Sequence, residues 1–267
     1  MDDHDDLKTA LTEVFTKLGY LVKTADSRDE ALELDSAEDF DLVITDLDGE
    51  KAFPTPEETD NHKEDPCLPT NDSEQFNRSH IKAFKICATN FNRADFDEEE
   101  LKSLFEIILN YKSQFVDRAP TVRHVREKIE FEIPSAISLM NSILEYLMKR
   151  VEKVGGVNPE SSNLFIALDE AFVNAVKHGN KFDAAKNVRI AADISPKEAR
   201  FTVEDEGEGF DVNSIPDPLD PENLFKTSGR GVLLIHNIMD EVRYNERGNR
   251  LEMIKKSEAR SPKSKVN

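Results

Sequence analysis

The chain has no tryptophan, only 7% aromatic residues and two cysteines among its 267 residues. Few aromatic rings argue against the stacking platforms that bind carbohydrate or single-stranded nucleic acid. Cys67 and Cys87 cannot build a disulfide scaffold or a four-thiolate metal site. No apolar run approaches the roughly 20 residues of a membrane-spanning helix, and the acidic start is the reverse of a signal peptide. These absences favour a soluble protein of the reducing cytoplasm.

Basic residues are also scarce. The chain has 35 Lys and Arg against 54 Asp and Glu, a net charge of -19. Such a surplus of negative charge argues against direct binding to nucleic acid or to an anionic membrane. Residues 1–112 hold 29 acidic and 12 basic residues and so carry most of this surplus. The asymmetry predicts two separately built halves.

Composition also marks three segments outside the folded cores. Residues 51–75 are rich in Pro, Asp, Glu and Asn and predict a long loop. Residues 113–125 contain a helix-stopping proline and are typical of a connector. We therefore expect a first domain at 1–112, a linker at 113–125, a second domain at 126–256 and a disordered tail at 257–267.

The first half alternates helical and strand patterns. The expected helices lie at 7–18, 31–34, 81–87 and 101–109, and the expected strands at 20–24, 42–45 and 90–92. The run at 42–45 is short and apolar and ends at Asp46, as a buried parallel strand would. Such alternation predicts a doubly wound α/β sheet whose chemistry lies at the carboxyl ends of its strands.

The second half has a different order of elements. The expected strands lie at 127–133, 188–194, 199–205, 241–244 and 250–255, and the expected helices at 135–154, at 159–178 and after Gly231. Helices come first and hairpins follow. This order predicts a two-layer α+β sandwich rather than a doubly wound sheet.

Two polar motifs stand out in this half. Glu170 and Asn174 lie four residues apart, so a helix places them on one face, where a carboxylate and an amide oxygen suit Mg²⁺. Two polar residues on a solvated helix face are the alternative. Asp205 ends a strand and could accept a hydrogen bond from an exocyclic amine such as that of adenine. Gly207 and Gly209 would let the backbone approach a ligand closely, although acidic, glycine-containing turns are common.

A third motif, Thr227-Ser228-Gly229-Arg230-Gly231, precedes an apolar helix. A glycine-rich segment at a helix N-terminus presents free N–H groups and the positive end of the helix dipole to anions. The spacing differs from that of a P-loop. Residues 211–228 are rich in Asp and Pro and suit a flexible lid.

The order Glu-x-x-x-Asn, Asp-x-Gly-x-Gly and Gly-x-Gly resembles the GHKL ATPase superfamily, which includes histidine kinase catalytic domains, gyrase B, Hsp90 and MutL. The segment from Glu170 to Gly179 looks most like the anti-sigma-factor serine kinases. This resemblance implies a Bergerat-type sandwich that binds ATP and Mg²⁺. It also implies that Asn174 coordinates Mg²⁺, that Glu170 is the general base or at least orients the acceptor hydroxyl, and that Asp205 binds the adenine amine.

The resemblance assigns the remaining site residues to the nucleotide as well. Those that would shape the floor or hold the phosphates are Gly207, Gly209, Ser228, Gly229, Arg230 and Gly231. Thr227 stands where such kinases tend to carry an arginine that engages the substrate protein, which leaves the partner open.

In the first half, Asp2, Asp3 and Asp46 would repel one another unless they shared a divalent cation. Abundant acidic residues are the plain alternative. The surrounding segments resemble a response-regulator receiver domain, which implies that Asp46 accepts a phosphoryl group and that Asp2 and Asp3 bind Mg²⁺. Ala94 stands at the position where receiver domains carry a lysine. The competing interpretation is therefore a degenerate receiver domain with a regulatory or docking role.

Together these resemblances imply a cytoplasmic protein that binds Mg-ATP and phosphorylates Ser or Thr on an anti-anti-sigma (STAS) protein under control of the N-terminal domain. A sigma factor is a further expected partner, and homodimer formation is left open. The alternatives are a non-catalytic, nucleotide-dependent partner-switching protein and a phosphorelay response regulator with an ATPase-like output domain.

Overall fold

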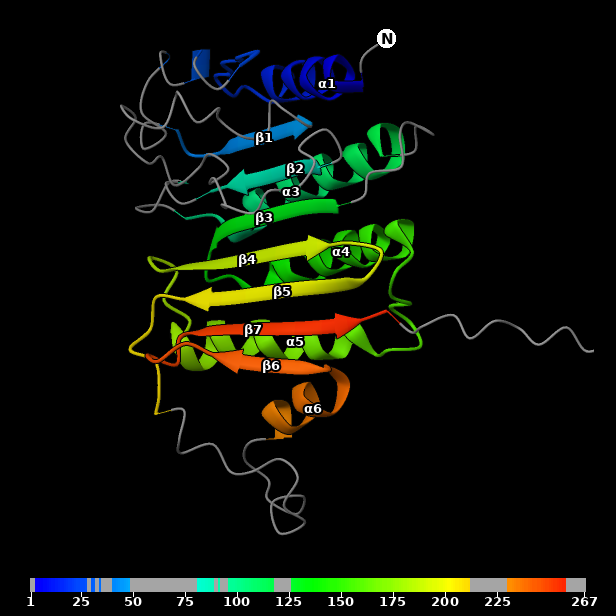
Figure 1. Cartoon of the computed structure of the whole chain (residues 1–267). Helices are drawn as coiled ribbons and strands as arrows, with labels where there is room; N and C mark the ends of the chain where they lie inside the picture. Colours follow the sequence, from blue (N-terminus) through cyan, green and yellow to red (C-terminus); the bar gives the residue numbers. More distant parts are fainter. Residues whose placement is uncertain are drawn as a thin grey trace, which may run out of the picture.

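A computed structural model describes residues 3–27, 30, 31, 34, 40–48, 81–88, 91, 96–117, 126–211 and 230–257. Its centre is one seven-stranded mixed sheet in the order β1-β2-β3-β4-β5-β7-β6. The strands are β1 Val43–Asp48, β2 Ile81–Cys87, β3 Arg126–Pro134, β4 Asn187–Ile194, β5 Glu198–Asp205, β6 Glu241–Tyr244 and β7 Arg250–Lys256. Figure 1 shows these strands stacked in this order from top to bottom.

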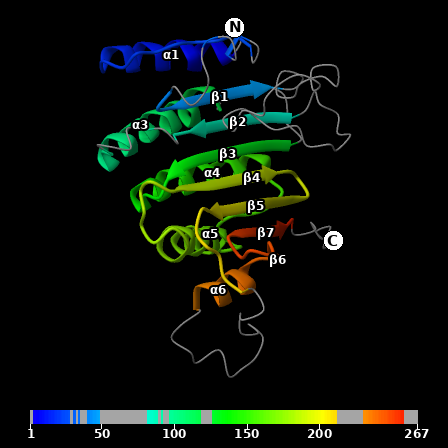
Figure 2. The same cartoon turned by 90° about the vertical axis from the view of Figure 1, so that its left-hand side faces the viewer.

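Helices α3, α4 and α5 lie behind the sheet in Figure 1, and α1 lies beyond β1 in both views (Figure 2). The α-helices are α1 Asp3–Lys17, α3 Glu98–Tyr111, α4 Met140–Val154, α5 Leu164–Asn174 and α6 Arg230–Ile238. Three short helical segments join them: η4 Lys112–Val116, η5 Ile137–Leu139 and η6 Ala175–Gly179. None of the helices in the described part of the chain is long and apolar enough to cross a membrane.

The elements expected in the second half are confirmed. Strands β4 and β5 alternate between buried and half-buried residues, because only one face of an antiparallel sheet packs against the helices. Helix α4 is followed by Gly155, whose φ of 77° is the left-handed conformation that favours glycine at the C-terminal cap of a helix. Helix α5 begins at Leu164 rather than at 159, because the preceding residues form turns and Asn163 is left-handed.

Several expectations for the first half are wrong. Residues 81–87 form strand β2 and not a helix, since a short apolar run is typical of either structure. Residues 20–24 form no strand. The strand expected at 42–45 is confirmed as β1, but it runs antiparallel to β2. The helix expected at 101–109 is confirmed as α3.

The receiver-like, doubly wound sheet is not confirmed. Strand β2 instead pairs in parallel with β3, from Ile81 opposite Arg126 to Cys87 opposite Glu132. The expected linker begins inside η4, where Val116 and the adjacent Asp117 are buried. The sheet thus continues across the expected boundary, and the division into two domains stays a prediction.

The same core spans this boundary. Phe84 of β2 packs edge-on against Phe131 of β3, with ring centroids 6.3 Å apart, and against Tyr146 of α4 at 5.8 Å. Phe105 of α3 also contacts Phe131. The loop expected at 51–75, residues 90 and 92 of the expected strand, residues 32 and 33 of the expected helix and the tail from 258 lie outside the described residues.

Candidate functional site

Gly231, the last residue of the third sequence motif, meets the first motif where helices α5 and α6 pack together. An added Cβ at Gly231, in the first turn of α6, would overlap Oε2 of Glu170 and would lie 3.5 Å from Nδ2 of Asn174. Both α5 side chains are half-buried. The absence of a side chain at Gly231 therefore lets the α6 backbone approach the carboxylate–amide pair directly.

The sequence of α5 explains why this pair faces away from the core. Leu164, Leu168 and Phe172 are buried, and they fix which face of the helix packs against the sheet. The last turn of α5 widens into the π-helical segment η6, in which the Asn180 N–H donates to the carbonyl of Ala175 at 2.8 Å. Single π turns often occur at functional sites.

The second motif lies at the end of this π turn. An added Cβ at Gly179 would overlap the carboxyl group of Asp205, and one at Gly207 would overlap the carbonyl of Gly179. The Gly207 N–H donates to Oδ1 of Asp205 at 2.8 Å. Two glycines thus permit the close contact between η6 and the end of β5 that positions Asp205.

Asp205 is half-buried in this contact. Burial raises the pKa of its carboxyl group above the ordinary value, while the Gly207 hydrogen bond and the charge of Arg247 act in the opposite direction. A carboxylate partly removed from water is a good acceptor for a single amine donor.

Asn180 supports the site, and sequence reasoning missed it. Its buried amide donates to Ser135 Oγ at 2.6 Å and to the Asn187 carbonyl at 2.8 Å, and its oxygen accepts from the Glu206 N–H at 2.9 Å. The residue therefore joins the ends of β3, β4 and β5 to η6. The position of Asn180 directly after Gly179 is only a weak sign of a role in the site, because polar residues commonly follow helices.

Comparison with known proteins agrees with this geometry. Residues 133–255 match the family model of the histidine kinase-like ATPase domain. The C-terminal half contains such an ATPase domain.

The relatives of this chain include proteins named serine-protein kinase RsbW. The protein from Staphylococcus epidermidis is 28% identical over 142 residues, which is 50% of this chain and 89% of that protein. The protein from Staphylococcus aureus RF122 is 29% identical over 152 residues, 52% of this chain and 94% of that protein. A domain of this family implies ATP binding, and the similarity to these kinases is distant.

Some residues expected in the ATPase site are placed and others are not. Gly231 lies against Glu170 and Asn174, and Gly207 lies with Asp205 against the end of η6. Gly209 has a φ of 77° and belongs to the same loop as Asp205. Ser228, Gly229, the side chain of Arg230 and most of the expected lid lie outside the described residues.

The acidic site expected before the ATPase domain is not seen as a metal centre. The carboxylate of Asp46 accepts from Nζ of the buried Lys112 at 2.7 Å. Asp2 and the side chain of Asp3 lie outside the described residues, as does Ala94. Within the described ranges, no group of three His, Cys, Asp or Glu residues could hold a metal ion. The metal and phospho-acceptor roles stay predictions.

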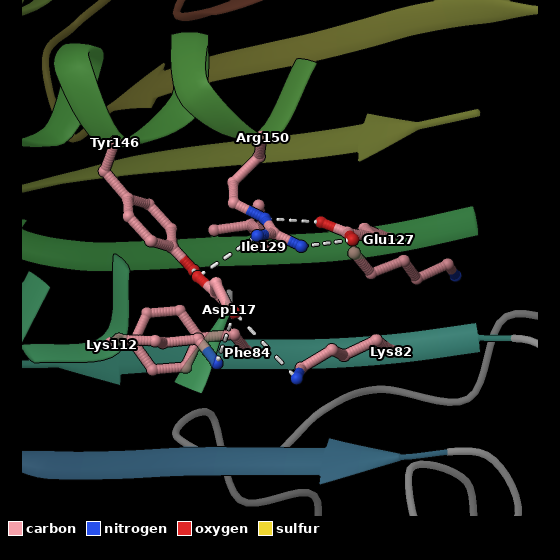
Figure 3. A pocket seen from close by; sticks show the side chains of 9 residues that line it. Lys82, Phe84, Lys112, Asp117, Glu127, Ile129, Tyr146 and Arg150 are labelled. Carbon is pink, nitrogen blue, oxygen red and sulfur yellow. Dashed lines mark hydrogen bonds and ion pairs between the residues drawn. The ribbon is translucent and has the colours of Figure 1, made fainter. Parts of the chain in front are cut away.

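A small polar pocket lies beside this ion pair, between the N-terminal elements and the ATPase domain (Figure 3). Asp117, which follows η4, is at its centre: its Oδ2 accepts from the Tyr146 hydroxyl at 3.2 Å and lies 3.2 Å from Nη1 of Arg150. Its Oδ1 lies 3.5 Å from Nζ of Lys112. Arg150 also donates to Glu127 from Nε at 2.8 Å.

These buried charges come from both halves of the chain. Asp117 and Lys112 precede the ATPase domain, whereas Tyr146 and Arg150 belong to its helix α4. Burial and the neighbouring Asp117 raise the pKa of Tyr146 well above its ordinary value, so its hydroxyl stays a donor. We call Lys112, Asp117, Glu127, Tyr146 and Arg150 the buried polar network. Its members pair with one another, so the network joins the halves of the sheet.

Proposed function

We propose that this protein binds Mg-ATP and transfers its terminal phosphoryl group to a Ser or Thr of a small STAS-type antagonist protein that controls a sigma factor. The observation that carries the proposal is the contact of Gly231 with Glu170 and Asn174, because it brings one residue of the third motif against both residues of the first. The serine-protein kinase names of the relatives support the choice of reaction.

The residues present suit magnesium and ATP. Asn174 and Glu170 offer hard oxygen ligands and acceptors of the kind that Mg²⁺ and its waters prefer, and Asp205 offers a partly desolvated acceptor for an amine. Bound Mg-ATP supplies the phosphoryl group that is transferred. Phosphoryl transfer depends mainly on positioning and charge neutralisation, so few protein groups are needed.

Each residue has a defined task in this proposal. Asn174 would hold the magnesium ion, and Asp205 would accept a hydrogen bond from the adenine amine. Glu170 would accept the proton of the Ser or Thr hydroxyl at one of its carboxylate oxygens, or would orient that hydroxyl. The backbone N–H groups near Gly231, at the start of α6, would face the phosphates. Glycine is needed at this position because a side chain would collide with Glu170.

Transfer of radiolabelled phosphate tests the proposal, with the STAS proteins of the same genome as acceptors. We expect Glu170→Gln to retain ATP binding and to lose transfer by about 100-fold or more, since a general base contributes this much. Asn174→Ala should lose both ATP binding and phosphoryl transfer. Asp169→Asn removes a neighbouring half-buried carboxylate of the same helix and serves as the control.

Two results would contradict the kinase assignment. Equal transfer by wild type and Asn174→Ala would remove the site from the reaction. ATP binding without transfer to any STAS protein, together with a stable sigma-factor complex, would instead support a partner-switching protein that uses nucleotide only as a ligand.

A further inference from the structure

The loop that carries Asp205 rests on the turn between β6 and β7. The Asp205 N–H donates to the carbonyl of Asn249 at 3.0 Å, and the Asn249 side-chain amide donates back to the Asp205 carbonyl at 2.7 Å. The turn thus holds the backbone of Asp205 through hydrogen bonds to both its N–H group and its carbonyl group. These contacts join segments more than 40 residues apart in the sequence.

Arg247, in the same turn, holds the next part of the loop. Its Nη2 donates to the carbonyl of Gly207 at 2.8 Å, and its own carbonyl accepts from the Phe210 N–H at 3.1 Å. An added Cβ at Gly209 would overlap the Arg247 carbonyl, and one at Gly248 would overlap the carbonyl of Phe210. At Gly209 and Gly248 the loop and the turn are therefore in direct backbone contact.

The turn is braced before it meets the loop. Oδ1 of Asn245 accepts from the N–H groups of Gly248, Asn249 and Arg250 at 2.9, 3.1 and 3.2 Å. Gly248 adopts the left-handed conformation, with a φ of 78°. A side-chain amide that caps its own turn restricts the backbone of that turn. The backbone position of Arg247 is therefore fixed.

We propose that Arg247 is a positioning residue, which fixes the Asp205–Phe210 loop so that the protein prefers a 6-aminopurine nucleotide to a 6-oxopurine nucleotide. The inference rests on the proposed function, in which Asp205 accepts a hydrogen bond from the amine. A 6-oxo group is itself an acceptor and would face the Asp205 carboxylate without a donor. A loop held at a fixed distance makes that mismatch costly, whereas a loose loop can move away from it.

The charge of Arg247 acts in the same direction. It opposes the effect of burial on the pKa of Asp205 and so helps to keep the carboxyl group ionised. An ionised carboxylate accepts from an amine but cannot donate to a 6-oxo group. Position and charge thus favour the same purine.

Calorimetric titration of the full chain with Mg-ATP and with Mg-ITP tests the inference. We expect wild type to bind ATP more tightly, and Arg247→Ala to reduce the ATP/ITP ratio of affinities by about tenfold, as the loss of one charge-assisted hydrogen bond implies. Arg247→Lys, which keeps the charge and a donor, should restore part of the ratio. Arg243→Ala is the matched control, because Arg243 lies on β6 of the same hairpin and pairs with Glu241 instead.

The outcomes separate this inference from the proposed function. If wild type binds neither nucleotide, the proposed function fails. If wild type prefers ATP and Arg247→Ala keeps the full preference, the inference alone is overturned. An equal loss of ATP and ITP affinity, accompanied by a lower melting temperature, would also overturn it, because it would show a role in stability only.

Discussion

At the scale of single residues, the site depends as much on missing side chains as on those present. Glu170, Asn174 and Asp205 could be chosen from the sequence because their spacing places them on a helix face and at a strand end. The reason for the glycines became visible only in three dimensions: Gly231 makes room for Glu170, and Gly179 makes room for Asp205. Sequence spacing cannot show which distant group a glycine lies against.

Gly231→Ala should therefore impair transfer without unfolding the protein. The added methyl group would overlap Oε2 of Glu170 and force the carboxylate to another rotamer. A displacement of about 1 Å at a catalytic group can cost on the order of 100-fold in rate. The measurement is the transfer rate at saturating ATP, with Asn237→Ala on the exposed part of α6 as control. An unchanged rate would show that Glu170 has freedom to move, and would contradict its assigned role.

Asp205 should give nucleotide binding a characteristic pH dependence. The adenine amine needs the ionised carboxylate as its acceptor. The affinity for ATP should therefore fall as the pH drops through the raised pKa of Asp205. The fall should begin at a higher pH than for an ordinary aspartate. Besides Gly207 and Arg247, the charges that act on this carboxyl group are those of Glu204 and Lys186.

Stability should respond to pH in the opposite sense. A carboxyl group whose folded pKa is raised binds its proton more tightly in the folded state. Its contribution to stability is therefore present at low pH and is lost as the pH rises through that pKa. Titrations of ATP between about pH 4.5 and 8 test the binding effect, with Asp205→Asn, which lacks this titrating carboxyl group, as the reference. An identical pH profile for both proteins would exclude Asp205 as the titrating group.

At the scale of elements, the sequence predicted best those segments whose burial follows from their own pattern. Helix α3 and strands β4 and β5 have regular apolar periodicity and were found where expected. The sequence favours a helix at 81–87 where the structure has strand β2, because a short apolar run is typical of either structure and the two lysines of this run do not mark a solvated face. Lys85 is buried, and Nζ lies 2.9 Å from Oε1 of Glu130 on the neighbouring strand. This ion pair joins two strands that are distant in sequence, so the local sequence pattern cannot predict it.

Asn180 offers a test of how separate elements hold the site together. Asn180→Ala would leave the Ser135 hydroxyl, the Asn187 carbonyl and the Glu206 N–H without this partner. Each buried polar group left unsatisfied costs about 1–3 kcal/mol, so we expect a clear fall in the melting temperature and weaker ATP binding.

A second substitution at this position separates the two directions of bonding. Asn180→Asp keeps an acceptor for Glu206 but loses the donors to Ser135 and Asn187, so it should retain the loop contact and still be destabilised. Thermal unfolding with and without Mg-ATP provides the measurement, and Asn237→Ala again serves as an exposed control. Wild-type stability in Asn180→Ala would mean that water replaces the side chain without cost.

At the scale of the whole molecule, the two halves differ in charge but share one sheet. The net charge changes along the chain, but composition cannot show that β2 pairs with β3 or that Asp117 contacts Arg150. Such pairings join residues distant in sequence, and no local pattern specifies them. A regulatory domain that docks and detaches would have to break this pairing and expose the buried polar network.

Breaking a buried ion pair by removing one partner is costly, on the order of 3–5 kcal/mol, because the other charge stays buried. We therefore expect the described parts of both halves to unfold together.

Hydrogen exchange in increasing denaturant tests this expectation: the amides of β2 and those of β5 should exchange at the same denaturant concentration. Asp117→Asn should lower that concentration for both strands, whereas Glu13→Gln, in an exposed pair with Lys17, should change neither. Earlier exchange of β2 alone would instead show that the N-terminal half opens by itself, and would restore the model of a detachable regulatory domain.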